Sequence, residues 1–266
     1  MMNADICEKS ILVVAHPDDE ILWFSSILAD VGHVVLCYLG ELVNPEFGDQ
    51  RRQILIDYPL QDKMSCLELV SLGLSRPQNF LNPQFSKFGI DFTDAQGVDE
   101  KFKEHYRENY RLLRKKLAHI LAGYQNVFTH NPWGEYGHEE HVQVYRVIQE
   151  LQKDMGYNIL FSNYCSNRTV HLTSCLVDTC VVGARATDRA IARKIFEVYE
   201  RTNTWTWYDN WVWPSQETFF LETCSETQSV NAGSLLPVNM IVMPPLPPQP
   251  ASSESRVRRL KRFLGV

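Results

Sequence analysis

The sequence predicts an α/β fold in which helices cover both faces of a mainly parallel sheet, as in Rossmann-like proteins. Short apolar runs rich in β-branched residues alternate with segments of helical periodicity, which is typical of a sheet buried on both faces. The first two apolar runs, residues 10–15 and 34–39, enclose one helical pattern and so form a β-α-β unit. With 266 residues and no internal repeat, we expect a single domain with a short C-terminal tail.

The first elements follow from the spacing of apolar residues. Residues 10–15 form a nearly continuous apolar run, which predicts a buried strand. Apolar residues then recur at helical spacing from Glu20 to Val31, and Gly32 stands where a helix end is expected. A second short strand is expected over residues 34–39.

The rest of the chain continues the alternation with less regular patterns. We expect a long loop with some helix over 41–62, a helix over 64–72 and irregular chain over 75–98. Further on we expect helices over 99–123, 137–155 and 188–199, strands over 126–129 and 159–162, and a β-rich segment over 168–184. Five prolines between positions 244 and 250 predict a stiff extended segment. The expected domain therefore spans residues 1–242, and 243–266 form a proline-rich linker and a basic tail.

The charge of the chain excludes one class of partner. The net charge is -6 and the isoelectric point is about 5.8, whereas a nucleic-acid binder needs a basic face. Residues 256–262 are the exception, because all their charged side chains are basic. This tail is expected to be disordered; an amphipathic helix on anionic lipid is the alternative interpretation. The pattern does not indicate an oligomeric state.

The sequence also predicts a compartment. Runs of eighteen or more apolar residues do not occur, and the first ten residues carry acids where a secretory leader has a basic flank. The seven cysteines are never spaced as C-x-x-C, so we expect reduced, mostly buried thiols and no thiolate zinc site. We therefore expect a cytoplasmic protein.

The first candidate motif is His-Pro-Asp-Asp-Glu at residues 16–20, directly after the first strand. In an open α/β sheet the carboxyl ends of the strands form the ligand-binding edge. Acidic residues in a first helical turn also complement the helix dipole without any function. That simpler reading accounts for the acids but leaves His16 unexplained.

The second candidate motif covers residues 129–141, directly after the expected strand 126–129. His138 and His141 are spaced to share one face of an opening helix, although such a pair alone more often faces solvent. Together with His16 and Asp19 the pair gains significance. Two histidines and one aspartate, with a fourth position left for water, are the pattern of a catalytic zinc site.

The two motifs resemble those of the LmbE-like or PIG-L-like N-acetylglucosaminyl de-N-acetylases, and the resemblance covers about residues 9–200. The family is marked by an A/P-H-P-D-D-E segment after the first strand and a later G-x-G-H-x-x-H-like segment. Residues 15–20 and 134–141 match them in the right order. The family's R-x-x-E pair, aligned near Leu60 and Lys63, is missing here.

The resemblance implies a role for each matched residue. His16, Asp19 and His141 would bind the metal, with Zn²⁺ as the default and Fe²⁺ tolerated by the same ligands. Asp18 would be the general base, and His138 and Tyr136 would assist the transition state. Family members remove the acetyl group from N-acetylglucosamine linked to inositol, malate or other aglycones, and some cleave related amides.

The chemistry is consistent with these roles. An amide is a poor electrophile, and a zinc ion both polarises its carbonyl and lowers the pKa of a water. Asp18 stands beside a ligand without being one, so it can take the water proton and deliver it to the leaving amine. His138 can donate a hydrogen bond to the oxyanion.

Two further groups are candidate substrate contacts. Arg51 and Arg52 are the basic residues that would substitute for the missing pair, although arginines more often lie on the surface. Four of the six tryptophans fall within residues 205–213, together with Tyr208. Aromatic faces suit a sugar ring, but clustered tryptophans more often form a core or an interface.

The sequence thus predicts a metal-dependent hydrolase that removes the acetyl group from an N-acetylated sugar conjugate, a small molecule. An amidase of a thiol conjugate or an N-acyl glycopeptide is the catalytic alternative. A catalytically dead sugar-binding relative is a third, and intact Asp18 argues against it. A receiver-like domain would also place paired acids after its first strand, but it has no use for His16, His138 and His141.

Overall fold

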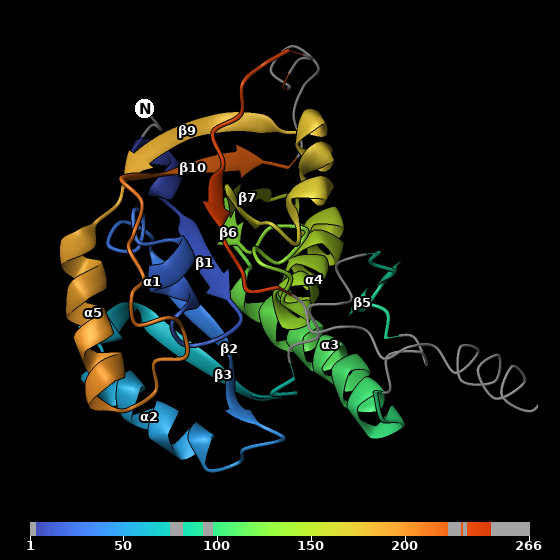
Figure 1. Cartoon of the computed structure of the whole chain (residues 1–266), viewed down its shortest axis with the longest axis vertical. Coiled ribbons are helices and arrows are strands. Elements are labelled where there is room, and N and C mark those ends of the chain that lie inside the picture. Colours follow the sequence, from blue (N-terminus) through green and yellow to red (C-terminus); the bar gives the residue numbers. More distant parts are fainter. Residues whose placement is uncertain (1–3, 75–81, 93–97, 223–229, 231–232, 246–266) are drawn as a thin grey trace, which may run out of the picture.

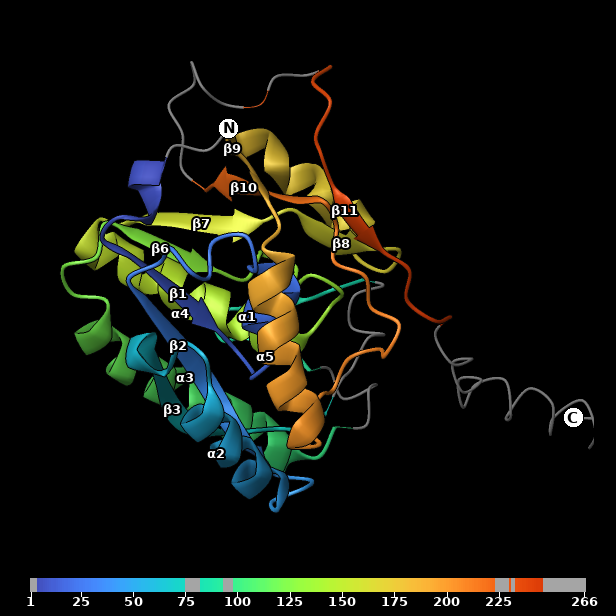
Figure 2. The same ribbon diagram turned by 90° about the vertical axis from the view of Figure 1, so that its left-hand side faces the viewer.

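A computed structural model of the chain describes residues 4–74, 82–92, 98–222, 230 and 233–245. Its centre is a seven-stranded sheet in the order β3-β2-β1-β6-β7-β10-β9. β3, β2, β1, β6 and β7 run parallel, whereas β10 is antiparallel to both β7 and β9. Figure 2 shows this order running from β9 down to β3. The predicted mainly parallel α/β fold is confirmed.

The strands of the central sheet are β1 (Ser10–Val14), β2 (His33–Glu41), β3 (Met64–Ser71), β6 (Asn126–Thr129), β7 (Asn158–Ser162), β9 (Cys180–Ala186) and β10 (Gln216–Leu221). Two small sheets are formed by β4 (Phe85–Ser86) with β5 (Gly89–Ile90), and by β8 (Tyr164–Ser166) with β11 (Asn239–Ile241). β1 and β6 are neighbours although the chain visits β2 and β3 between them. The connection therefore changes direction there, which makes the carboxyl ends of β1 and β6 the topological switch point of the sheet.

The α-helices are α1 (Asp19–Trp23), α2 (Phe47–Asp57), α3 (Glu100–Ile120), α4 (Glu139–Met155) and α5 (Arg189–Arg201), with 3-10 turns at Ala4–Cys7, Gln61–Lys63 and Val170–Asp178. Figure 1 shows α1, α2 and α5 on one side of the sheet and α3 and α4 on the other. Helices thus cover both faces, as predicted.

The alternation of side chains along β1 explains why both faces are covered. Leu12 and Val14 pack with α1 and α5 in one apolar cluster, whereas Ile11 and Val13 pack with α3 and α4 in the other. All four side chains are fully buried. Because successive residues of a strand point to opposite faces, a strand that is apolar at every position needs a layer on each side.

One predicted element is wrong in type. Residues 64–72 were expected to be helical, but Met64–Ser71 form β3, which pairs with β2. The pairing shifts between Leu36–Cys66 and Tyr38–Leu69, so β3 carries an extra residue, and Glu68 has a positive φ of 53°. This bulge breaks the two-residue alternation of apolar positions, which produced spacing that resembles a helix.

Other predictions differ in extent. The helix expected over 20–31 ends at Trp23 and gives way to tight turns. The segment 168–184, expected to be β-rich, contains the 3-10 turn Val170–Asp178 before β9. Val170, one of the β-branched residues in this segment, is 42% exposed, so β propensity here does not reflect a place in the sheet.

The prediction that every cysteine is reduced is wrong for Cys180, which is disulfide-bonded. The absence of C-x-x-C spacing does not exclude other pairings, and the prediction rested on that absence. Cys7, Cys37, Cys66 and Cys165 are free.

The proposed boundary at residue 242 stays a prediction. Up to Pro245 the chain is described, and β11 pairs with β8 just before this boundary. The basic residues 256–262 lie outside the described part of the chain. Among the described helices, none combines the length and the apolar character needed to span a bilayer.

Candidate metal and catalytic site

The first motif forms the turn between β1 and α1, at the switch point of the sheet. His16 and Asp19 are both nearly fully buried, and the backbone N–H of His16 donates to Asp19 Oδ2 at 2.7 Å. Asp18 adopts a positive φ of 101°, which is rare and strained for a residue with a side chain. Its backbone N–H is held by two acceptors, Glu20 Oε2 at 3.0 Å and the Tyr199 hydroxyl at 2.9 Å.

The second motif forms the turn between β6 and α4. Gly134 has a φ of 64°, and a Cβ at this position would lie 2.6 Å from the carbonyl oxygen of His138, so a side chain does not fit. The N–H of His138 donates to the Gly134 carbonyl at 3.1 Å, which closes the turn. His138 is the residue that caps α4, and His141 lies in the first turn of the helix. The two imidazoles therefore face the same region, as their spacing predicted.

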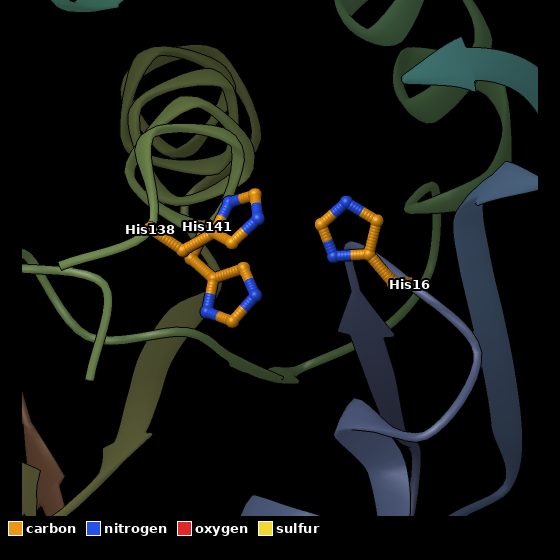
Figure 3. A group of neighbouring side chains, drawn as sticks. All are labelled: His16, His138 and His141. Atoms are coloured by element: carbon orange, nitrogen blue, oxygen red, sulfur yellow. The ribbon is translucent and has the colours of Figure 1, made fainter. Parts of the chain in front are cut away.

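The two turns bring the histidines together across the end of the sheet. Figure 3 shows His16 on the loop after β1, opposite His138 and His141 at the start of α4. Nitrogens of these three residues all lie within 4.8 Å of one another, and so do ligand atoms of Asp19, His130 and His141. Asp19 lies between the imidazoles: its Oδ2 is 3.3 Å from His16 Nδ1 and its Oδ1 is 3.2 Å from His141 Nε2.

Hydrogen bonds to the far nitrogens determine which lone pairs are free. Nδ1 of His141 lies 2.6 Å from Glu135 Oε2, and Nε2 of His16 lies 2.8 Å from Glu140 Oε2. A carboxylate accepts, so each of these nitrogens carries the proton. The lone pairs of His141 Nε2 and His16 Nδ1 therefore both point towards Asp19. His141 Nε2 is buried and has no hydrogen-bond partner among the described residues.

In the other two histidines, His138 and His130, the lone pair of the ring already accepts a hydrogen bond from a backbone N–H. His138 Nδ1 accepts from the backbone N–H of Glu140 at 3.2 Å, so a neutral His138 carries its proton on Nε2. His130 Nε2 accepts from the N–H of Ala15 at 2.8 Å, and its Nδ1 faces Glu135. Neither residue keeps an unused lone pair for a metal. This separates His16, Asp19 and His141 from the two histidines beside them.

Burial and neighbouring charges shift the pKa values of three residues of the site, His16, Asp18 and His138. Burial alone would lower the pKa of His16, but hydrogen bonds to the carboxylates of Asp19 and Glu140 raise it to about 10, so a cation bound at Nδ1 would take the place of a proton there. Burial, and then the neighbouring charge of Asp19, raise the pKa of Asp18 to about 6. Burial and the charges of neighbouring histidines hold the pKa of His138 well below its ordinary value, so His138 is neutral. Carboxylates that draw a proton onto His16 are suited to a cation.

A cavity of about 410 Å³ opens beside these residues. His16, Asp18, Asp19, His138 and Tyr136 all line it, so every predicted site residue except the buried His141 reaches its wall. Tyr136 packs with its ring centroid 5.5 Å from that of His141, and burial raises the pKa of its hydroxyl well above the ordinary value. The hydroxyl therefore stays protonated and remains a donor.

The tryptophan-rich segment forms another part of this wall. Trp207 and Tyr208 line the cavity, and Thr206 donates a hydrogen bond to Asp18 Oδ2. Trp211 packs edge-on against the buried Trp23 of α1. The segment thus serves the packing around α1 and the cavity together.

The two candidate arginines differ. Arg51 is buried, lines the cavity and lies 3.6 Å from Glu41 Oε1. Arg52 is exposed and pairs with Asp49 and Glu68. Arg51 lies in α2, the helix directly before β3, whereas the sequence alignment had placed the family's arginine near Leu60 and Lys63.

The sequence did not identify the carboxylates that fix the histidines. Glu135 contacts both His130 and His141, and Glu140 contacts His16 and accepts from the Ser71 hydroxyl at 2.6 Å. Both lie inside the second motif, but their positions in the sequence did not indicate that they contact the histidines. His130 did carry one, because it follows β6 directly, as His16 follows β1 after one residue.

Comparison with known proteins agrees with this arrangement of motifs. The chain is 30% identical over 158 residues to the 1D-myo-inositol 2-acetamido-2-deoxy-alpha-D-glucopyranoside deacetylase of Mycolicibacterium vanbaalenii, covering 52% of each chain. It is 24% identical over 174 residues to an uncharacterized protein of Acanthamoeba polyphaga mimivirus, covering 64% of this chain and 67% of that one. The chain spans about half the length of the deacetylases that it matches.

Among solved structures, a deacetylase in complex with teicoplanin aligns with a TM-score of 0.48 at 12% identity, covering 82% of this chain and 99% of that one. The sequence profile of the PIG-L family, described as GlcNAc-PI de-N-acetylase, matches residues 11–151. That match contains both motifs and more than half of the chain. The protein therefore belongs to the PIG-L family.

Proposed function

We propose that the protein is a metal-dependent hydrolase that removes the acetyl group from an N-acetylated amino sugar conjugate. One observation carries the proposal: two buried imidazole lone pairs face one carboxylate, beside an acid held in a strained conformation, at the wall of a cavity. The matched relatives are named as deacetylases of an acetamido sugar joined to inositol. Those names support the reaction class for this chain.

His16 Nδ1, Asp19 and His141 Nε2 are the proposed metal ligands. Support comes from the unpartnered buried nitrogen of His141 and from the carboxylates around His16. Two imidazoles and one carboxylate suit Zn²⁺ with an open position, and Fe²⁺ tolerates the same set. Glu135 and Glu140 orient the two imidazoles from behind, as the outer partners of metal-bound histidines commonly do.

A bound divalent cation supplies a polarised amide carbonyl and a water of lowered pKa. Asp18 is the proposed general base, which accepts a proton from the attacking water and returns it to the amine as the C–N bond breaks. Thr206 donates to Asp18 Oδ2, so Oδ1 is the oxygen available for that proton. Acetate and a free amine are the products.

His138 is the proposed donor to the oxyanion that forms on the carbonyl oxygen. Its Nε2–H is fixed by the capping bond at Nδ1, and its lowered pKa keeps it neutral, so it donates without competing for the metal. Tyr136 offers a protonated hydroxyl on the same wall.

The cavity suits a single sugar residue in size and lining. A volume of about 410 Å³ falls within the range of small-molecule sites. Trp207 and Tyr208 offer aromatic faces to a sugar ring, and Arg51 offers a buried cation for a polar substituent. The sugar's aglycone extends outside this volume. A cytoplasmic location and the absence of a nucleic-acid partner stay predictions.

The proposal is tested by incubating metal-loaded protein with a panel of N-acetylhexosamine conjugates, an N-acyl glycopeptide and an acetylated thiol conjugate, assaying free amine and acetate. We expect equal amounts of both products from the hexosamine conjugates. Asp18→Asn is the matched control: it should keep the metal and lose about a hundredfold or more in kcat. Turnover of the thiol conjugate alone would favour the amidase alternative. Binding without turnover of any substrate would favour a sugar-binding relative.

A further inference from the structure

A second hollow adjoins the catalytic cavity. It has a volume of about 550 Å³ and shares Tyr208 with that cavity. One wall comes from the tryptophan-rich segment, with Trp211 and Val212, and the other comes from β11 and the residues after it, with Met240 and Val242. We call this hollow the aglycone groove.

The lining of the aglycone groove differs from that of the catalytic cavity. His16, Asp18, Asp19 and Arg51 are among the ionisable groups of the cavity, whereas none of the described residues that line the groove is charged. A substituent of the sugar that extends into this groove therefore meets uncharged side chains, which are aliphatic or aromatic except for the amide of Asn210.

Apolar side chains on both walls of the groove are left in solvent. Val242 is 83% exposed, Val212 77% and Met240 55%. Single exposed apolar residues are common, but a contiguous group around a hollow marks a binding site. A ligand that covers these side chains removes their apolar surface from water, which favours binding.

We propose that the aglycone groove binds an uncharged, apolar aglycone of the N-acetylated sugar, so that the substrate is an amphipathic glycoside. This inference rests on the proposed deacetylase function. The argument for this occupant is continuity: Tyr208 belongs to both walls, so a sugar in the catalytic cavity directs its substituent past Tyr208 into the groove. The matched relatives are named for an inositol conjugate, whose aglycone is polar. The apolar lining of the groove predicts that this chain prefers an apolar aglycone to a polar one such as inositol.

The test compares methyl, butyl and hexyl glycosides of N-acetylglucosamine as substrates of the full-length, metal-loaded protein, below the concentrations at which they form micelles. Each methylene that leaves water strengthens binding several-fold. We expect kcat/KM to rise with chain length, by at least about tenfold from methyl to hexyl. Binding of the hexyl glycoside to the metal-free protein, measured by calorimetry, should show the same order.

Val212→Asp and Val242→Asp place a charge on each wall without touching the catalytic residues. Both variants should lose the preference for the hexyl glycoside and keep turnover of the methyl glycoside within about twofold, because only apolar burial is removed. Val181→Asp is the matched control: Val181 is 43% exposed on β9 and lies outside the lining of the groove. It should leave the preference intact.

The outcomes separate this inference from the proposed function. Equal kcat/KM for the three glycosides, or an unchanged preference in both groove variants, would overturn the groove and leave the deacetylase standing. Faster turnover of an inositol glycoside than of the hexyl glycoside would also overturn the groove. Release of no amine from any glycoside would refute the proposed function itself.

Discussion

Tyr199 and Tyr58 donate to the same carboxylate oxygen, yet we expect only Tyr199 to influence the general base. The Tyr199 hydroxyl lies 2.6 Å from Glu20 Oε1, and that of Tyr58 lies 3.0 Å from it. The Tyr199 hydroxyl also accepts from the backbone N–H of Asp18 at 2.9 Å. Tyr199→Phe therefore removes two buried hydrogen bonds and Tyr58→Phe removes one.

The magnitude follows from the number of bonds and from the strain at Asp18. Each buried hydrogen bond contributes about 0.5–1.5 kcal/mol, so Tyr199→Phe should lower the free energy of unfolding by about 1–3 kcal/mol and Tyr58→Phe by about half of that. The φ of 101° at Asp18 costs about 1–3 kcal/mol and persists because its N–H is held from two sides. Loss of the hydrogen bond from the Asp18 N–H to the Tyr199 hydroxyl allows Asp18 to relax away from the attacking water.

The assay measures kcat, KM and metal content for both variants. Tyr199→Phe should lower kcat by about tenfold with KM and metal content unchanged, because Asp18 binds neither substrate nor metal. Tyr58→Phe should keep kcat within about twofold, because it does not touch Asp18. Equal losses of kcat in the two variants would refute the reasoning, since both weaken the bonds to Glu20 and only one reaches Asp18.

Three other predictions concern metal affinity, pH dependence and packing. Glu135→Gln should weaken metal affinity about 10–100-fold by replacing the acceptor that orients His141, measured by competition with a chelator; unchanged affinity would show that Glu135 has no such role. Burial raises the pKa of Glu217 above its ordinary 4.5, so its contribution to stability is present below that pH and is lost as pH rises through the raised pKa. The unfolding free energy of the parent minus that of Glu217→Gln should therefore fall as the pH rises above 4.5 in urea titrations, and an increase would contradict the assigned sign. Phe219→Ala should cost about 3–5 kcal/mol because the side chain is fully buried, whereas the exposed Phe85 should tolerate the same change within about 1 kcal/mol.

Local signals predicted the parts of the site that lie next to strands. His16 follows β1 after one residue, and the loop that follows β6 leads directly to His138 and to His141 at the start of α4. Parallel strands share their carboxyl edge, so residues far apart in sequence meet there without any further information. The spacing of His138 and His141 on one helix supplied the rest.

Long-range contacts were not predictable. Tyr199 of α5 and Thr206 reach Asp18 across about 180 residues of sequence, and no periodicity records that contact. β3 was misread because the bulge at Glu68 disrupts the alternation that identifies a strand. The burial of Arg51 was also not predictable. A charged side chain is seldom buried without a partner, and the local sequence does not show which residues will pair with it.

The central claim is that His16, Asp19 and His141 hold one divalent metal while His138 does not. The most direct measurement is the metal content of His141→Ala and His138→Ala, purified in parallel and loaded with Zn²⁺ under identical conditions. The two imidazoles lie 4.6 Å apart, so each variant removes a similar ring from the same place. His141→Ala should lose most of the bound metal, and His138→Ala should retain about one ion per chain. Retention in both variants, or loss confined to His138→Ala, would contradict the assignment.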